Sequence, residues 1–386
     1  MLQTLPRSAR SWAQLRRRMS AGAISPEVLP KGSPFNTSPD SPHLSVLSYN
    51  VLAPIYVRPI DSRTGAVQAF AAFEWCGEGD ELLDFAIRCP RLLAEIQAAA
   101  ADIVCLQEVQ FESRSGGHDS GFGLPAWLRP LTIEGGGDYF ARIPAQSDLR
   151  EIAERNQRVL NCFAPVANVL LVKQGRLEML DDEATKSATT RVGALVKGAE
   201  GSALSRNMQP TAVFSVHLDA THESQRVGTI VKCLQQARQL GTREVLVAGD
   251  MNTEMLPGSC VAALITDAEQ LVASDTSAAD VEEQVEAEAD KDDGAAGLAK
   301  PSLLDELLVQ ECASALRLGQ ERSPNAEEIH AWKELYATAA AAPQQTRIAL
   351  RRVPTHGTRA AYDHGQHAGP CRSWRLDHIL YRCVYN

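Results

Sequence analysis

The chain has 386 residues, of which 44% are hydrophobic and 5% aromatic, and its formal net charge is −10. This length can bury one large core or two small ones. The negative charge excludes nucleic-acid binding through the overall field of the protein, so any such contact must be local. The sequence contains no run of 18 apolar residues, so we expect no membrane-spanning helix.

Residues 1–43 are predicted to precede the globular domain. The first 25 residues carry five arginines and no acid, interleaved with leucines and a tryptophan, which is typical of an organelle transit peptide. A basic disordered tail fits equally well, and residues 26–43 have the composition of a linker. We therefore expect an intracellular protein, either mitochondrial or plastid, or else cytoplasmic. The nine scattered cysteines, without a CxxC pair, predict mostly reduced core thiols and neither a disulfide framework nor a zinc site.

The domain is predicted to span residues 44–386. Apolar and β-branched runs predict strands at 44–52, 102–109, 167–177, 190–198, 210–218 and 244–252. Pro90 is expected to open a helix over 91–101, with Leu93, Ile96 and Ala100 on its buried face. A second helix is expected between the last two of these strands, because its apolar residues recur at helical spacing: Val227, Ile230, Val231 and Leu234.

The composition changes twice in the last third of the chain. Residues 267–300 are rich in Asp, Glu and Ala and predict an acidic disordered insertion. Residues 301–340 again look helical. From Arg347 onward arginines outnumber acids, which indicates either a local surface that attracts phosphate or a scattered solvated face.

Polar side chains stand at the ends of several predicted strands: Asn50, Glu108, His217, Asp250 and Asn252. A glutamate at the rim of an apolar strand needs a partner, and Mg²⁺, or Mn²⁺ in its place, suits a carboxylate with water and phosphate oxygens. Asp250 and Asn252 are two residues apart and face the same side if the chain is extended. Taken singly, these residues also fit a surface glutamate, an Asx turn, a core histidine and a cap. Their coincidence favours a phosphate site.

The segments SYNVLA, LQEV, VHL, GDMN and WRLDHILY, in this order, resemble the endonuclease/exonuclease/phosphatase superfamily, which includes DNase I. Residues 48–56 and 73–108 are similar to the carbon-catabolite-repressor-type deadenylases, nocturnin and the 2′-phosphodiesterases. The resemblance implies an α+β fold, a four-layer αββα sandwich in which the motifs meet at one end.

The same resemblance implies roles for single residues. Glu108 would ligate Mg²⁺, with Asn50 beside it, and Asp250 would position or deprotonate the attacking water. Asn252 and His217 would hold the scissile phosphate, with His217 also a candidate proton donor. Asp377 would orient a catalytic histidine. The reaction would be an in-line attack on phosphorus, stabilised by the metal and by fixed donors.

The sequence departs from this pattern in two places. The family's Ser-Asp-His motif on a last core strand is missing after Asp377, so we expect the sandwich to lack that strand and to expose a sheet edge. His378 should face away from Asp377 on a strand, which leaves loop histidines as substitutes: His356, His364 and His367. The segment at Asn168 lacks the family's usual acid. We therefore expect a truncated gene model or a derived member with weakened activity.

The predicted function is a Mg²⁺-dependent 3′-exoribonuclease that acts on RNA 3′ ends and releases nucleoside 5′-monophosphates. Such an enzyme needs aromatic residues for base stacking, and the candidates are Tyr56, Phe122, Trp127, Tyr139 and Trp374. Two alternatives remain open. One is a phosphatase of a small nucleotide such as a dinucleotide phosphate, and the other is a catalytically inactive scaffold with the same fold. No obligate protein partner is evident from the sequence.

Overall fold

The computed structural model describes most of the chain between residues 44 and 382. The described ranges are 44–67, 84–114, 121–180, 190–206, 208–242, 244–253, 258–264, 305–306, 308–309, 311–313, 323–340, 351–353, 359–361, 372–374 and 377–382. The predicted presequence and linker, 1–43, and the predicted acidic insertion, 267–300, lie outside these residues. The domain boundaries therefore stay predictions.

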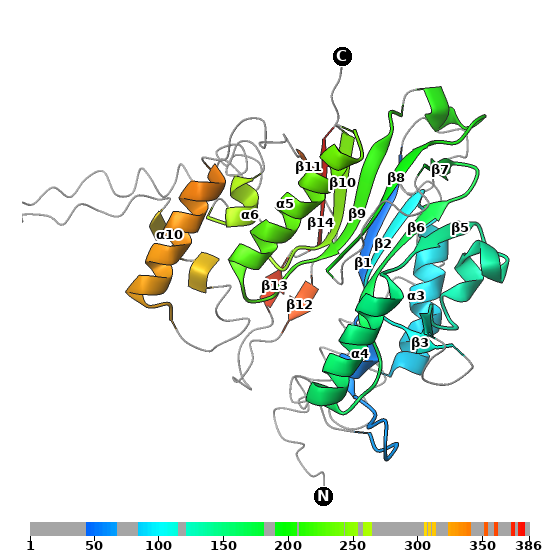
Figure 1. Ribbon diagram of the computed structural model, residues 1–386, viewed down its shortest axis with the longest axis horizontal. Coiled ribbons are helices and arrows are strands. Elements are labelled where there is room, and N and C mark those ends of the chain that lie inside the picture. Colours follow the sequence, from blue (N-terminus) through cyan, green and yellow to red (C-terminus); the bar gives the residue numbers. More distant parts are fainter. Residues whose placement is uncertain are drawn as a thin grey trace, which may run out of the picture.

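Two β-sheets form the centre of the molecule (Figure 1). The first has the order β1-β2-β6-β5, formed by Val46–Asn50, Ile103–Gln110, Val166–Lys173 and Tyr139–Arg142. The second has the order β11-β14-β10-β9-β8-β7, formed by Arg351–Val353, Asp377–Arg382, Glu244–Asp250, Thr211–His217, Arg191–Gly198 and Leu177–Met179. Two small hairpins pair β3 with β4 and β12 with β13, at Glu112–Ser113, Phe122–Gly123, Arg359–Ala361 and Arg372–Trp374.

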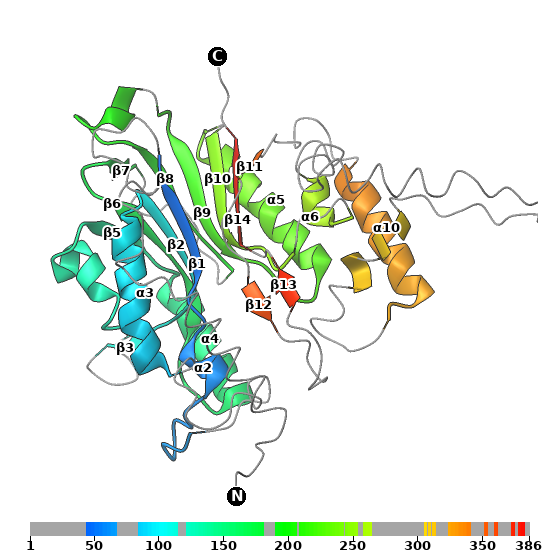
Figure 2. The same ribbon diagram turned by 180° about the vertical axis from the view of Figure 1, so that it is seen from behind.

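Helices cover the outer face of each sheet, which the reverse view also shows (Figure 2). The first sheet is covered by α3 and α4, at Phe85–Ala99 and Gln146–Leu160. The second is covered by α5 and α6, at Glu223–Gln239 and Cys260–Ala263, and α10, at Ala326–Ala340, packs against α6 on the outside. Short helical turns also occur, namely α2 at Pro54–Val57 and the 3₁₀ turns η2, η3 and η4 at Arg129–Leu131, Ile133–Gly135 and Ala203–Arg206. The predicted αββα sandwich is confirmed.

The strands are apolar on both faces because each sheet is buried on both sides. In β6, Val169 and Leu171 pack with the residues of α3 and α4. Their neighbours Leu170 and Val172 point the other way and join the cluster between the two sheets. This alternation explains why β6 reads as a continuous hydrophobic run in the sequence.

Two predicted elements have different bounds. Helix α3 begins at Phe85, six residues before the predicted range 91–101, because the Asp84 side chain accepts a hydrogen bond from the Ala86 N–H and caps it. Pro90 lies inside this helix, and the buried positions are Leu92 and Ile96. The predicted strand 167–177 is two strands, since Gly175, with φ of +75°, turns the chain from β6 into β7 of the other sheet.

The edge of the second sheet beside β14, the strand that begins at Asp377, also differs from what we expected. We expected an open edge there, but β11 pairs antiparallel with β14 from Arg351 to Val353. Over these residues the edge is therefore covered.

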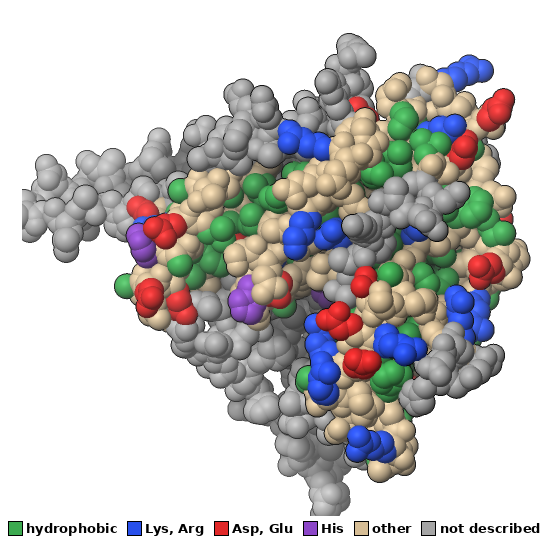
Figure 3. All heavy atoms as spheres, in the orientation of Figure 1, with side chains coloured by type: hydrophobic (Ala, Val, Ile, Leu, Met, Phe, Trp, Pro, Cys, Tyr) green, Lys and Arg blue, Asp and Glu red, His purple; other side chains and the backbone are tan. Residues whose placement is uncertain are grey.

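The remaining general expectations concern cysteines, the membrane and the surface. Five described cysteines carry free thiols, namely Cys89, Cys105, Cys162, Cys233 and Cys260, and Cys312 is buried in the core. Within the described ranges, no helix is long and apolar enough to cross a membrane. Figure 3 shows basic and acidic side chains interspersed on one face of the molecule.

Candidate active site

Glu108 reaches the candidate site through an irregularity in β2. The register between β2 and β6 shifts between Leu106 and Val109, so that Gln107 and Glu108 together oppose one residue, Asn168. Glu108 itself has a φ of +58°. Such a bulge bends the strand and changes the direction of a side chain. The Glu108 carboxylate consequently turns toward Asn50 and is only 8% exposed.

Asn50, the last residue of β1, joins carboxylates from both sheets. Its amide nitrogen donates to Glu108 Oε1 at 2.7 Å and to Asp250 Oδ2 at 2.9 Å. Its amide oxygen accepts the Leu52 N–H at 2.9 Å. The second oxygen of Glu108 accepts the Ala53 N–H at 3.2 Å. The Asn50 side chain thus acts as a donor to the two acids, and its oxygen is used by the backbone.

His217 completes this cluster from the neighbouring strand. It ends β9 and lies opposite Asp250 in the parallel pairing of β9 with β10. Its Nε2 is 4.0 Å from Glu108 Oε1 and 4.0 Å from Asp250 Oδ2, and the side chain is 28% exposed. An imidazole at this position faces two acids on one side and solvent on the other. It can therefore move a proton or contact an incoming anion.

The sequence suggested that Asp250 and Asn252 share one face of an extended strand, but the structure places them differently. Strand β10 ends at Asp250, and the Asn252 N–H then folds back to donate to Asp250 Oδ1 at 2.9 Å, which is an Asx turn. Asn252 has a φ of +48°, and its Nδ2 donates to the Leu218 carbonyl at 2.8 Å. Asn252 therefore fixes the buried Asp250 carboxylate through its backbone and ties the end of β10 to the end of β9.

Gly249 allows the two strands to approach closely at this point. A Cβ atom added to Gly249 would lie 1.9 Å from the carbonyl oxygen of Val216. Only glycine leaves room for the neighbouring backbone here. In the GDMN segment, Gly249 is therefore needed for packing, while Asp250 and Asn252 supply the polar groups.

Asp377 is placed by backbone register only. It pairs with Asp250, and His378 pairs with Gly249, in the antiparallel ladder of β10 and β14. The loop histidines His356, His364 and His367 lie outside the described residues.

Two of the five predicted aromatic platforms are core residues. Phe122 and Tyr139 are buried, and the Tyr139 hydroxyl donates to the Ala101 carbonyl. Trp127 packs edge-on against Phe85. Tyr56 is half-buried, and burial together with the charge of Glu108 raises its pKa to about 12. Of the described candidates, Tyr56 is the one linked to the acid cluster, whereas Phe122 and Tyr139 are not available for stacking.

The donor set suits a hard divalent cation. Within the described residues, no group of three or more His, Cys, Asp or Glu side chains is arranged to hold a metal ion. Mg²⁺ does not require such a group, because it takes one or two carboxylates and fills its remaining positions with water and phosphate oxygens. Glu108 fits this description, and two acids joined by one amide would be stabilised by a cation. The Asn50 amide, through its nitrogen, orients Glu108.

Asn168 has a structural role. It is 1% exposed, and its Nδ2 donates to the carbonyls of Thr190, at 3.0 Å, and Ser215, at 3.2 Å. The amide therefore joins the first sheet to the second, directly opposite the bulge that carries Glu108.

Two arginines near the site were not predicted from the sequence. Arg88 of α3 donates to the carbonyls of Val51 and Leu52, both at 3.0 Å, and so supports the turn after Asn50. Arg226 of α5 is fully buried behind Asn252. The signal for Arg226 was its i,i+3 spacing from Glu223 on a helix otherwise apolar on that face.

The fold is a four-layer sandwich. Its candidate site is a cluster of acids, an amide and an imidazole at the place where strands from both sheets end. No protein-family model matches the sequence, and no curated protein matches it. Solved structures with some similarity include the human Nocturnin catalytic domain with bound sulfate, at 19% identity and a TM-score of 0.33, covering 54% of this chain and 64% of that one. A humanized D. rerio TDP2 shows 16% identity and a TM-score of 0.31, covering 55% and 63%.

ANGEL2, described as a 2′,3′-cyclic phosphatase, is similar over a longer stretch. The identity is 15% and the TM-score 0.39, covering 88% of this chain and 82% of ANGEL2. By contrast, the match spans less than two thirds of the Nocturnin and TDP2 chains. At these identities and TM-scores, the similarity says nothing about the activity of this chain.

Proposed function

We propose that this chain is a Mg²⁺-dependent phosphodiesterase that shortens RNA from its 3′ end and releases nucleoside 5′-monophosphates. The observation that carries the proposal is the convergence of Glu108, Asp250 and His217, from three strands in two sheets, around the Asn50 amide. Convergence of acids and an imidazole at strand ends is costly to bury unless it serves a charged ligand. The order of the motifs in the sequence supports phosphate as that ligand.

Each residue then has a definite task. Bound at Glu108, Mg²⁺ would polarise a phosphate oxygen and stabilise developing negative charge. Asp250 orients a water molecule and takes its proton as the water oxygen attacks phosphorus. The bond from phosphorus to the 3′ oxygen breaks, and His217 supplies the proton that this oxygen needs. The Asn252 and Asn50 hydrogen bonds keep the Asp250 carboxylate in one orientation.

The test is Mg²⁺-dependent hydrolysis of a 5′-labelled oligo(A) by the full chain and by Glu108→Ala. Loss of an essential metal-binding carboxylate should lower kcat/KM by about 10²- to 10⁴-fold. The matched control is Glu112→Ala, because Glu112 is a nearby exposed glutamate paired with Arg129 at 2.8 Å. We expect Glu112→Ala to retain the wild-type rate and a ladder of products shortened one nucleotide at a time.

Two results would overturn the proposal. Release of inorganic phosphate from a dinucleotide phosphate, with oligo(A) left intact, would reassign the substrate. The absence of Mg²⁺-dependent hydrolysis of either substrate by the folded wild-type chain would favour an inactive scaffold.

A further inference from the structure

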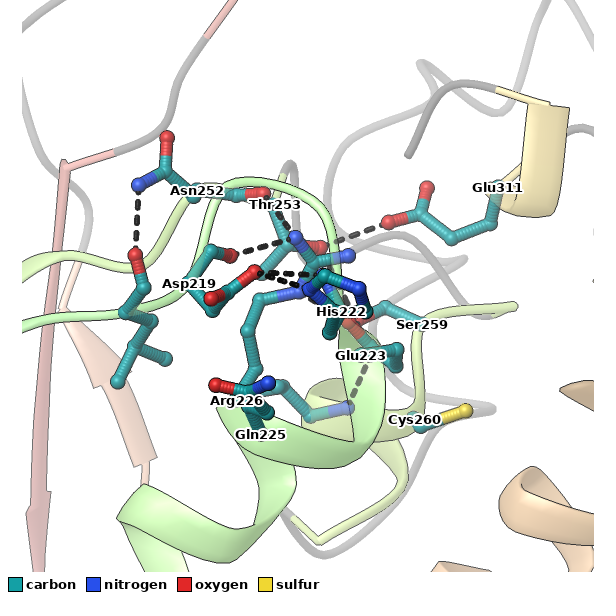
Figure 4. Close-up of polar contacts among 12 residues, drawn as sticks. Asp219, His222, Glu223, Gln225, Arg226, Asn252, Thr253, Ser259, Cys260 and Glu311 are labelled. Carbon is teal, nitrogen blue, oxygen red and sulfur yellow. Dashed lines mark hydrogen bonds and ion pairs between the residues drawn. The ribbon is translucent and has the colours of Figure 1, made fainter. Parts of the chain in front are cut away.

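Arg226 forms a buried junction between the loops that follow β9 and β10 (Figure 4). Its Nη1 lies within hydrogen-bonding distance of three backbone carbonyls, those of Asp219, at 2.9 Å, Ala220, at 3.2 Å, and Asn252, at 3.1 Å. The first two belong to the loop that follows β9 and His217. The third belongs to the turn that follows β10 and Asp250. One side chain therefore connects the loop after His217 with the turn after Asp250.

Glu223, one helical turn earlier on α5, balances the charge of Arg226. The Arg226 Nε donates to Glu223 Oε2, and both side chains are 1% exposed. The other carboxylate oxygen, Oε1, accepts the Val261 N–H at 3.0 Å and the Ser259 hydroxyl at 3.3 Å. The pair thus holds the start of α6 as well as the two loops.

The Asp219 side chain orders the same loop from the outside. Its Oδ1 accepts the backbone N–H groups of Thr221, at 2.8 Å, and His222, at 2.7 Å. Burial alone would raise the pKa of Asp219, but these hydrogen bonds and those of the two side chains together lower it. The loop is consequently fixed from outside by a carboxylate and from inside by Arg226.

A buried ion pair is a poor way to gain stability, because apolar side chains of similar size would fill the space without the cost of desolvation. What Arg226 provides is geometry. Its guanidinium can reach several acceptors at once in fixed directions, whereas a lysine presents a single compact charge. The Asn252 carbonyl that it holds belongs to a residue in the left-handed conformation, with φ of +48°.

We propose that Arg226, held by Glu223, is a positioning residue that sets the orientation of Asp250 and His217 by fixing the loops after β9 and β10. This rests on the proposed function, because the orientation serves hydrolysis. The backbone of Asn252 is the connection, since its carbonyl accepts from Arg226 and its N–H donates to Asp250.

The test compares Arg226→Lys with Arg176→Lys in the full chain. Arg176 is a matched control, because its Nε donates to Asp102 at 2.8 Å and the two side chains are 7% and 3% exposed. This pair lies at the start of β2 and after β6, at the far ends of those strands. We expect both variants to lose thermal stability. Arg226→Lys alone should lower kcat for oligo(A), by about 30-fold or more, with KM nearly unchanged.

A second readout does not depend on activity. Hydrogen exchange of the amides in 219–222 and 250–253 should become faster in Arg226→Lys than in Arg176→Lys, measured where both are folded. If Arg226→Lys does not fold, Glu223→Gln takes its place, because it keeps the acceptor for Val261 and removes the charge opposite Arg226.

The outcomes separate this inference from the proposed function. If the wild type hydrolyses no substrate, the proposed function fails and the exchange comparison decides whether Arg226 positions these loops. Equal exchange in the two variants would overturn the inference. A kcat of Arg226→Lys equal to that of Arg176→Lys, in an active enzyme, would overturn it as well.

Discussion

Glu108 and Asp250 lie in different sheets, yet their carboxylates are joined by one amide nitrogen, that of Asn50, at 2.7 and 2.9 Å. This arrangement holds the two sheets in register at the candidate site. It also brings two acids close together, so the cluster should respond both to removal of the amide and to divalent cations.

Asn50→Ala should therefore destabilise the chain when divalent cations are removed by a chelator. Two hydrogen bonds to charged groups are lost, which should lower the free energy of unfolding by roughly 2–4 kcal/mol. Adding Mg²⁺ should recover part of this loss because the cation offsets the repulsion between the acids. Urea unfolding in chelator and in Mg²⁺ measures both effects, and wild-type stability of Asn50→Ala in chelator would contradict the prediction.

Glu108→Gln should abolish stabilisation by Mg²⁺. For the wild type, Mg²⁺ at ten times its Kd should raise the free energy of unfolding by about 1.4 kcal/mol, since it binds the folded state only. In Glu108→Gln the carboxylate that binds Mg²⁺ is lost. The variant should be at least as stable as the wild type in chelator because one of the two neighbouring acids is gone. Thermal unfolding with and without Mg²⁺ checks this, and an equal Mg²⁺ response in both proteins would rule out Glu108 as the ligand.

Gly249→Ala should be strongly destabilising, because its Cβ would meet the Val216 carbonyl oxygen at 1.9 Å and push β9 away from β10. We expect a loss of about 3 kcal/mol or more, within the range of severe backbone and packing defects. The control is Gly228→Ala, an interior position of α5 with nothing within 4 Å of the added Cβ. That substitution should stabilise by about 0.5–1 kcal/mol, and denaturant unfolding of both variants measures the contrast.

Tyr56→Phe should reduce the amplitude of the tyrosine titration near pH 12. Burial and the Glu108 charge raise the pKa of Tyr56 to about 12, and burial does the same for Tyr139. Because the folded state favours the protonated phenol, the contribution of Tyr56 to stability is complete below pH 10 and is lost as the pH rises through 12.

Tyrosinate absorbance measured against pH tests this assignment. The step near pH 12 should shrink in Tyr56→Phe and, by a comparable amount, in Tyr139→Phe. In Glu108→Gln the Tyr56 step should move to lower pH, whereas the Tyr139 step should not move. A Tyr56 step unmoved by Glu108→Gln would show that the two groups are not coupled.

The strands that carry the site could be predicted because their hydrophobic pattern is strong and each ends in polar residues. The two-sheet sandwich followed from the resemblance of those motifs. The β2 bulge could not be predicted, because an inserted residue leaves no mark in an apolar run such as that of Ile103–Gln110. Without the bulge, alternation alone cannot say to which face Glu108 points.

Local capping and turns explain the other differences. Asp84 extends α3 backward past Pro90, and an N-cap outweighed the expectation that proline starts the helix. Asn252 was assigned to an extended strand, but its side chain and left-handed backbone form a turn. The buried Arg226 was missed because sequence reasoning treats an i,i+3 acid–arginine pair as a solvated surface pair. Its role depends on loops that are distant in sequence.

The pairing of β10 with β14 has a consequence for biosynthesis. These neighbours flank the candidate site at Asp250 and Asp377, but a long stretch of chain separates them, and a ribosome needs on the order of ten seconds to make it. During that interval β8, β9 and β10 can assemble while the outer edge of β10 stays unpaired. A nascent chain stalled before Asp377 should therefore expose the unpaired edge of β10, which other strands can pair with. Chaperone binding at this edge should end when β14 pairs with β10.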